Sequence, residues 1–261
     1  MNVSSWLKRT ATSSKVARLD SELILAHALK KERVFLYAHP EYELSEMEEK
    51  CANEMLARRE NHEALAYVFG HKEFYGRNFE VSSDVLIPRP ESEEIINLAK
   101  DLRPRKILDV GTGSGCLAVT LKLELPEAEV TAVDISPKAL ETAKKNARNL
   151  GAKVNFMQSD LLESVKNEHF DLIVANLPYV DKNWDWLSPE LEFEPDLALY
   201  AEDGGLSVIK RLIDGIEQNL SENGHLMLES DMLQHEAVKA YAEQNSSLRL
   251  SEESGLIQVF A

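Results

Sequence analysis

Residues 107–119 read ILDVGTGSGCLAV, an apolar run that leads into three alternating glycines and then into a second apolar run. The first run has the composition of a strand buried on both faces of a parallel sheet, and the second run predicts a helix. Gly111, Gly113 and Gly115 allow a sharp turn between them and let a ligand approach the backbone, as in dinucleotide-binding folds. A glycine-rich turn is equally consistent with a purely structural role, so its meaning depends on the rest of the chain.

Strands and helices are expected to alternate from residue 106 to the end of the sequence. Such alternation is typical of an α/β fold, a doubly wound, mainly parallel sheet covered by helices. Two short strands around Gly255 predict a closing hairpin that adds an antiparallel strand and brings the sheet to seven strands. The other strands are expected at 106–110, 129–135, 153–160, 170–176 and 224–230, and the helices at 114–125, 136–151, 205–220 and 234–245.

The first part of the chain has a different pattern. Apolar residues recur there at three- and four-residue spacings, which predicts amphipathic helices. Ser45 and Glu48 have the spacing of a capping box at the start of one of them. Short aromatic and β-branched runs on either side of Gly76 then predict a hairpin. We therefore expect two domains, a helical one over residues 1–70 and a hairpin plus α/β domain over 71–261.

Composition narrows the classes of function. The chain has 261 residues and a net charge of −16, from 29 Lys plus Arg against 45 Asp plus Glu. This acidic balance disfavours non-specific binding to nucleic acid, which depends on phosphate neutralisation. Cys51, Cys116 and the scattered histidines lack the spacing of a metal site. No apolar run approaches the roughly 20 residues of a membrane span and no secretory signal is recognisable, so we expect a cytoplasmic protein without membrane association.

Acidic residues beside the glycine turn make the prediction more specific. Asp109 lies two residues before the first glycine, where dinucleotide-dependent enzymes usually have an apolar residue, and the glycine spacing is G-x-G-x-G. Asp134 ends the next strand, where a ribose-binding carboxylate is expected. Together these features resemble the cofactor site of class I S-adenosylmethionine-dependent methyltransferases. The resemblance implies that Asp134 binds the ribose hydroxyls and that Asp160 and Leu161, after the third strand, flank the adenine. Asp160 is alternatively a helix cap or part of a solvated loop.

The strand at 170–176 ends in an unusual run, Asn176-Leu177-Pro178-Tyr179. An amide nitrogen is a poor nucleophile, because its lone pair is delocalised. Hydrogen-bond acceptors can localise that lone pair and aim it at a methyl donor, and the Asn176 side-chain oxygen and the Leu177 carbonyl are suited to this role. Pro178 stiffens the turn, and Tyr179 offers a flat face to a planar substrate group. The run therefore predicts a methyl-transfer site for an amide or amine.

The same run resembles the N-P-P-Y motif of amino-methyltransferases, with Leu177 where the first proline is usual. Because N-L-P-Y also occurs in RNA adenine dimethyltransferases, these four residues do not define the substrate. The segments at 17–29, 66–96 and 193–206 do, since in this order they resemble HemK-type glutamine methyltransferases of peptide-chain release factors over most of the chain. The most specific part is F-Y-G followed by I-P-R-P-E-S-E.

Membership of that family implies N5-methylation of the glutamine in the Gly-Gly-Gln loop of a bacterial release factor, with S-adenosyl-L-methionine as the donor. It also implies that the helical domain helps to hold the release factor, and we expect a monomer. Catalysis is assigned to Asn176, Leu177, Pro178 and Tyr179, and cofactor binding to Asp109, Gly111, Thr112, Gly113, Ser114, Gly115, Asp134, Asp160, Leu161 and Asn176. No metal is expected.

Two other hypotheses stay open from the sequence. An adenine-N6 methyltransferase of DNA or RNA would use the same Asn-x-Pro-Tyr chemistry, but it should have a basic face or a target-recognition domain. A binding module that keeps the cofactor fold without catalysis has Leu177 as its only support. Trp184 and Trp186 follow the catalytic run directly, and they either cover the substrate or anchor a loop.

Overall fold

The computed structural model describes residues 1–261, which divide into two compact units. The first consists of Met1–Gly70 together with the short segment Ser188–Phe193. The second consists of His71–Leu187 and Glu194–Ala261. The first unit has one hydrophobic core, and the second unit has one on each face of its sheet. No helix in either unit has the length and apolar character needed to cross a bilayer.

The first unit is entirely helical. Its core is apolar and includes the fully buried indole of Trp6, whose Nε1–H donates to Asn53 Oδ1 at 2.9 Å. The predicted capping box is confirmed, since Ser45 and Glu48 cap the fourth helix reciprocally. The helices are α1 (Val3–Ser13), α2 (Arg18–Leu29), α3 (Arg33–Ala38), α4 (Glu46–Glu60) and α5 (Leu65–Phe69).

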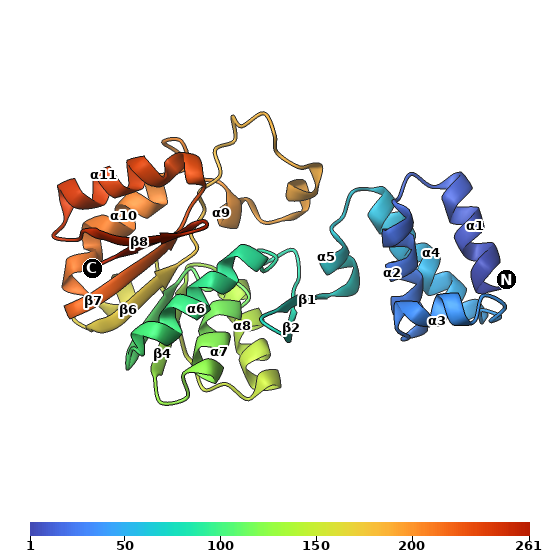
Figure 1. Ribbon diagram of the computed structural model, residues 1–261, viewed down its shortest axis with the longest axis horizontal. Helices are drawn as coiled ribbons and strands as arrows, with labels where there is room; N and C mark the ends of the chain where they lie inside the picture. Colours follow the sequence, from blue (N-terminus) through green and yellow to red (C-terminus); the bar gives the residue numbers. More distant parts are fainter. The chain divides into compact units, whose positions relative to one another are not determined.

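The second unit contains the seven-stranded sheet, with strand order β5-β4-β3-β6-β7-β9-β8 (Figure 1). The five strands from β3 to β7 are parallel to their neighbours, and β9 is antiparallel to both β7 and β8. The predicted fold class is therefore confirmed. The strands are β3 (Lys106–Val110), β4 (Glu129–Asp134), β5 (Asn155–Gln158), β6 (Phe170–Ala175), β7 (Leu220–Glu229), β8 (Leu250–Ser254) and β9 (Ile257–Phe260).

Helices cover both faces of this sheet, α10 and α11 one face and α6, α7 and α8 the other (Figure 1). The apolar strands supply both cores, because successive side chains point to opposite faces. Leu108 of β3 lies in the core under α10 and α11, whereas its neighbour Ile107 lies in the other core. These helices are α6 (Glu93–Leu102), α7 (Cys116–Glu124), α8 (Pro137–Leu150), α10 (Ser207–Gly215) and α11 (His235–Asn245).

Smaller elements connect the sheet to its loops. A separate hairpin, β1 (His71–Phe74) and β2 (Arg77–Glu80), surrounds Gly76 as predicted. A 3₁₀ turn at Pro90–Ser92 precedes α6, and the short helix α9 (Asp196–Leu199) precedes α10.

Two predicted boundaries differ from the structure by four residues or more. Strand β7 begins at Leu220 rather than at Gly224, because its register against β6 shifts between Phe170 and Leu172 and extra residues are accommodated there. The helix expected over 205–220 ends at Gly215 and continues only as a 3₁₀ turn, Ile216–Gln218.

Candidate active site

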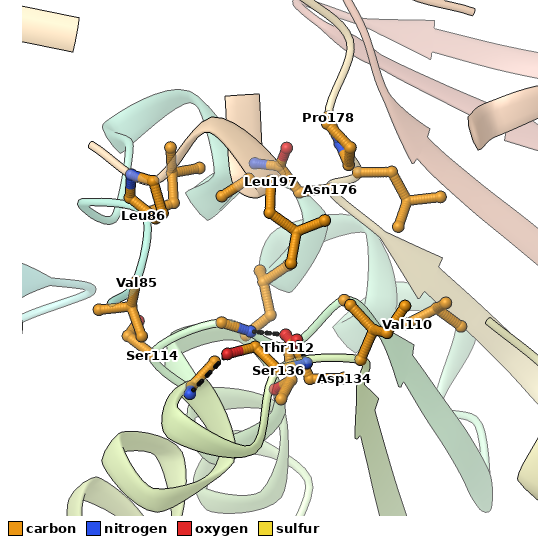
Figure 2. A pocket seen from close by; sticks show the side chains of 18 of the residues that line it. Val85, Leu86, Val110, Thr112, Ser114, Asp134, Ser136, Asn176, Pro178 and Leu197 are labelled. Carbon is orange, nitrogen blue, oxygen red and sulfur yellow. Dashed lines mark hydrogen bonds between the residues drawn. The ribbon is translucent and has the colours of Figure 1, made fainter. Parts of the chain in front are cut away.

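A cavity of about 280 Å³ lies at the carboxyl ends of β3, β4, β5 and β6 (Figure 2). In parallel sheets this edge is where ligands bind, because the loops after the strands meet there. Figure 2 shows Asn176 on one side of the cavity and Thr112 and Asp134 on the other. Of the predicted site residues, the cavity is lined by Gly111, Thr112, Gly113, Ser114, Asp134, Asp160, Leu161, Asn176, Leu177 and Pro178.

The glycine turn forms one wall of this cavity. The N–H groups of Gly111 and Thr112 both donate to the Val133 carbonyl, at 2.9 and 3.0 Å, which ties the turn to the end of β4. Gly113 has φ +54° and Gly115 has φ +80°, in the left-handed region that glycine adopts without strain. Gly111 and Gly113 line the cavity, so at these two positions the turn presents backbone without a side chain, beside the side chains of Thr112 and Ser114.

Asp109 lies beneath the turn and does not line the cavity. It is completely buried, and its Oδ2 accepts hydrogen bonds from the Thr112 hydroxyl at 2.6 Å and from the Ala118 N–H at 3.2 Å. Its Oδ1 has no hydrogen-bond partner. Burial, with a smaller contribution from the Asp134 carboxylate, raises the pKa of Asp109 to about 7. In this geometry Asp109 connects β3 to the glycine turn and to α7, so its hydrogen bonds hold these elements together.

Asp134 ends β4 and reaches the cavity. Its Oδ2 accepts from the Gly113 N–H and its Oδ1 from the Ser136 N–H, both at 2.8 Å. Burial raises the pKa of this carboxyl, and the backbone donors oppose that shift. A carboxylate has about four lone-pair sites, and the three backbone donors, Gly113, Ser136 and Ile135, leave one for a ligand. The residue is therefore suited to accepting a hydrogen bond from a ligand hydroxyl group.

Two predicted residues after β5 lie at the edge of the cavity. The Asp160 carboxylate pairs with Arg211 at 2.8 Å, so its side chain caps no helix. Leu161 adopts φ +48° and packs against the core below α10. Both line the cavity, Asp160 as a charged residue and Leu161 as an apolar one.

Asn176 follows the last residue of β6 and belongs to a chain of hydrogen bonds. Its Nδ2 donates to the Ser92 hydroxyl at 3.0 Å, and that hydroxyl donates to Glu229 Oε2 at 2.5 Å. The Tyr179 hydroxyl donates to the other carboxylate oxygen, Glu229 Oε1, at 3.3 Å. This chain occupies the nitrogen of the Asn176 amide and leaves its oxygen available as an acceptor.

Sequence reasoning missed Ser92 and Glu229. Both are buried, at 2% and 1% exposure. Burial raises the pKa of Glu229, and hydrogen bonds from the Ser92 and Tyr179 hydroxyls and from the Asn176 amide oppose that shift. The position of Glu229 depends on strand pairing: Ala175 of β6 lies opposite Leu228 of β7, so Asn176, which follows β6, comes beside Glu229, the last residue of β7. Ser92 belongs to the quoted I-P-R-P-E-S-E segment, in which no role was assigned to it.

The catalytic turn is held from the outside by the 3₁₀ turn Met232–Gln234, which precedes α11, and by the loop before α10. Gln234 Nε2 donates to the Tyr179 carbonyl at 2.8 Å and to the Gly204 carbonyl at 2.7 Å. A Cβ added at Gly205 would lie 2.0 Å from the Tyr179 carbonyl oxygen, so the two segments are packed as closely as backbone allows. Tyr179 itself does not line the cavity, and neither does Gly115.

The opposite rim of the cavity depends on a buried acid. Glu194 accepts hydrogen bonds from the Ile87 N–H at 3.1 Å and from Arg89 Nη2 at 2.5 Å. Glu194 thereby connects the loop before α6 to the segment that carries Leu197. Residues of this loop and of this segment line the cavity.

Trp184 and Trp186 lie outside the cavity lining. Their rings stack on each other with centroids 5.3 Å apart, and Trp186 is 61% exposed. The two indoles therefore form a stacked pair, Trp186 exposed and Trp184 half-buried, in the loop that follows the catalytic turn.

Comparisons with known proteins agree with this architecture. A family model described as the PrmC N-terminal domain matches residues 5–70, and one described as the methyltransferase small domain matches 81–187. A methyltransferase structure from Pyrococcus furiosus superposes with a TM-score of 0.56 at 19% identity, covering 80% of this chain and 96% of that one, which shows the fold alone.

Sequence relatives identify the family of the chain, which the shared fold does not. A release factor glutamine methyltransferase of Koribacter versatilis is 43% identical over 226 residues, which span 84% of this chain and 81% of the relative. One of Neisseria gonorrhoeae is 39% identical over 237 residues, 89% of this chain and 87% of the relative. The predicted resemblance is confirmed: this chain belongs to the release factor glutamine methyltransferase family.

Proposed function

We propose that this protein transfers a methyl group from S-adenosylmethionine to the N5 nitrogen of the glutamine in the Gly-Gly-Gln loop of a bacterial release factor. The observation that carries the proposal is Asn176, whose amide oxygen is free at the cavity while its nitrogen is bonded to Ser92. An acceptor held in this way can align an amide nitrogen, which a nicotinamide or nucleotide-binding site would not need.

Two features of the cavity support S-adenosylmethionine as the cofactor. Asp134 lines the cavity and keeps acceptor capacity beyond its backbone donors, which suits it to a ribose hydroxyl. The turn at Gly113 presents backbone rather than side chains to the same space. S-adenosylmethionine, when bound, supplies a methyl group activated by a sulfonium charge. We assign its binding to the glycine turn, Asp134, Asp160 and Leu161.

The chain's own residues would act on the substrate amide by orientation. The Asn176 side-chain oxygen and the Leu177 carbonyl accept hydrogen bonds from the two N–H groups of the glutamine, so that the nitrogen lone pair is aimed at the methyl group. Asn176 is neutral and cannot serve as a strong base. Preorganised acceptors are therefore the main catalytic contribution that we assign to this turn.

The direct test is the intact mass of a purified bacterial release factor after incubation with this protein and S-adenosylmethionine, followed by mapping of the modified residue. We expect one added methyl group on the Gly-Gly-Gln glutamine. Parallel reactions with DNA and with RNA test the adenine alternative, which the net charge of −16 disfavours. Methyl transfer only to nucleic acid would refute the proposal.

We further propose that the enzyme acts as a monomer in the cytoplasm and that the helical unit, Met1–Gly70, contributes to holding the release factor. Support for the second point is the match of this unit to the N-terminal domain of the same family. We expect the release factor to crosslink to residues of the helical unit, and no such crosslinked product to form when the release factor is omitted.

A further inference from the structure

We propose that Ser92 and Glu229 are positioning residues that determine which end of the Asn176 amide faces the substrate. This inference rests on the proposed function, because it assigns a role in the same methyl transfer. Ser92 lines the cavity, whereas Glu229 does not. Both act through Asn176, by holding its nitrogen so that its oxygen is the group presented to the cavity.

The polarity of the hydrogen-bond chain follows from the chemistry of its three members. The Glu229 carboxylate accepts the Ser92 hydroxyl at Oε2 and the Tyr179 hydroxyl at Oε1, so the Ser92 hydroxyl uses its single proton toward Glu229. Toward Asn176 the same hydroxyl can then only accept. The amide nitrogen is the only part of the Asn176 side chain that can donate, so it must be the atom that faces Ser92.

The fold keeps this chain in one arrangement. Glu229 ends β7 and Asn176 follows β6, and these two strands are hydrogen-bonded neighbours with Ala175 opposite Leu228. Ser92 comes from the 3₁₀ turn before α6 and is buried between the two. Because Ser92 and Glu229 are almost inaccessible to solvent, water does not compete for their hydrogen bonds.

A reversed Asn176 amide would defeat catalysis. Its NH₂ group would then point at the N–H groups of the substrate glutamine, so that two donors would face each other and one acceptor would be lost. Removing the Ser92 hydroxyl takes away one of the two acceptors that face the Asn176 amide nitrogen and leaves only the Glu229 carboxylate, so the reversed orientation becomes more populated. The loss should be smaller than that of deleting the amide, about five- to tenfold in rate, which corresponds to one ordinary hydrogen bond.

The experiment is single-turnover methylation of the release factor at saturating S-adenosylmethionine, with cofactor affinity measured separately by calorimetry. Ser92→Ala should slow the methyl-transfer step about five- to tenfold and leave cofactor affinity within about twofold. Ser92→Thr should recover most of the rate because it restores the hydroxyl. Ser92→Val, which has the shape of threonine without its hydroxyl, should be as slow as Ser92→Ala, and this matched pair decides the matter should Ser92→Ala fail to fold.

Two controls separate positioning from general stability. Ser254→Ala removes a comparable bond, from the Ser254 hydroxyl to Glu94 Oε1 at 2.7 Å, outside the cavity, and should leave the rate unchanged. In an Asn176→Ala background, Ser92→Ala should cause no further loss, because no amide remains to be oriented. A structural role for Ser92 would instead lower the rate by the same factor in both backgrounds.

Full activity of Ser92→Ala, equal rates for Ser92→Thr and Ser92→Val, or multiplicative losses in the double variant would each overturn the positioning role. A wild-type protein that does not methylate the release factor would refute the proposed function itself. The two failures are therefore distinguishable, since the wild-type reaction is measured first.

Discussion

Replacing Asp109 with asparagine should make the protein more stable at alkaline pH. The Asp109 carboxyl is completely buried, its Oδ1 has no hydrogen-bond partner, and burial raises its pKa from the ordinary 3.8 to about 7. A raised pKa means that the folded protein holds this proton more tightly than the unfolded chain does. The resulting stability is complete below about pH 3.8 and is lost as the pH rises through about 7.

The size of the effect follows from these two values. Each tenfold change in the ionisation equilibrium is worth about 1.4 kcal/mol, so ionised Asp109 costs on the order of 4 kcal/mol at pH 8. Most of the titration lies between pH 5 and pH 8, where the wild type should lose about 2 to 3 kcal/mol. In Asp109→Asn the amide oxygen keeps both bonds, to Thr112 and Ala118, and the group cannot ionise. Its NH₂ replaces the unpartnered oxygen, at a cost of about 1 to 3 kcal/mol at every pH.

The assay is urea unfolding of both proteins at a series of pH values from 5 to 8. The free energy of unfolding of Asp109→Asn relative to wild type should rise by about 2 to 3 kcal/mol across this range, whatever its starting value. Asp101→Asn, at an exposed position on α6, is the control and should show no such trend. A difference that is independent of pH, or that falls as the pH rises, would refute the reasoning.

Three further substitutions test the site. Asp134→Ala should weaken S-adenosylmethionine binding by about 1.5 to 3 kcal/mol in calorimetry, and unchanged affinity in a folded variant would contradict its assignment. Leu177→Pro should keep turnover, because the Leu177 N–H makes no hydrogen bond that the proline would remove. It should lower stability by about 1 to 3 kcal/mol, because the buried Leu177 side chain becomes smaller. A folded but inactive variant would contradict this prediction. Gly205→Ala should lower turnover by more than about tenfold, because its Cβ would lie 2.0 Å from the Tyr179 carbonyl oxygen. Gly204→Ala is the control: its Cβ would have nothing within 4 Å, so it should cost only about 1 kcal/mol of stability. Equal turnover rates in both variants would argue against close packing as the cause.

Local patterns predicted the elements of the fold well, for identifiable reasons. Ser136 and Pro137 mark the start of α8 by chemistry that lies within one turn of helix, and Ser136 does accept the Ala139 N–H. The start of β7 was mispredicted because Asn223-Gly224 looks like a turn. In the structure this pair lies inside a strand with an irregular register, which depends on the neighbouring β6 and not on the local sequence.

The same contrast explains what was found of the site. The glycine turn and the Asn176 run are contiguous in sequence, so their chemistry can be recognised without knowing the fold. The Ser92 bonds connect residues that are 84 and 137 positions apart, to Asn176 and Glu229 respectively. Such partners depend on strand order, and only the adjacency of β6 and β7 brings Glu229 beside Asn176. For Asp109 the local sequence pointed to a contact that the structure does not show. Its position beside the glycine turn suggested a cofactor contact, whereas its hydrogen bonds are to Thr112 and Ala118.

Leucine in place of the usual proline raises the question of what keeps the catalytic turn rigid. A proline ring would restrict the backbone locally, and Leu177 does not. Its side chain is instead 4% exposed and packs so closely on the glycine turn that a Cβ at Gly111 would lie 2.9 Å from Leu177 Cδ2. Gln234 holds the Tyr179 carbonyl two residues later. Because both ends of the turn are restrained by tertiary packing, the Leu177 carbonyl can remain a preorganised acceptor without the ring. The Leu177 side chain also brings the glycine turn into direct contact with the turn at Asn176. A displacement of either turn should therefore displace the other.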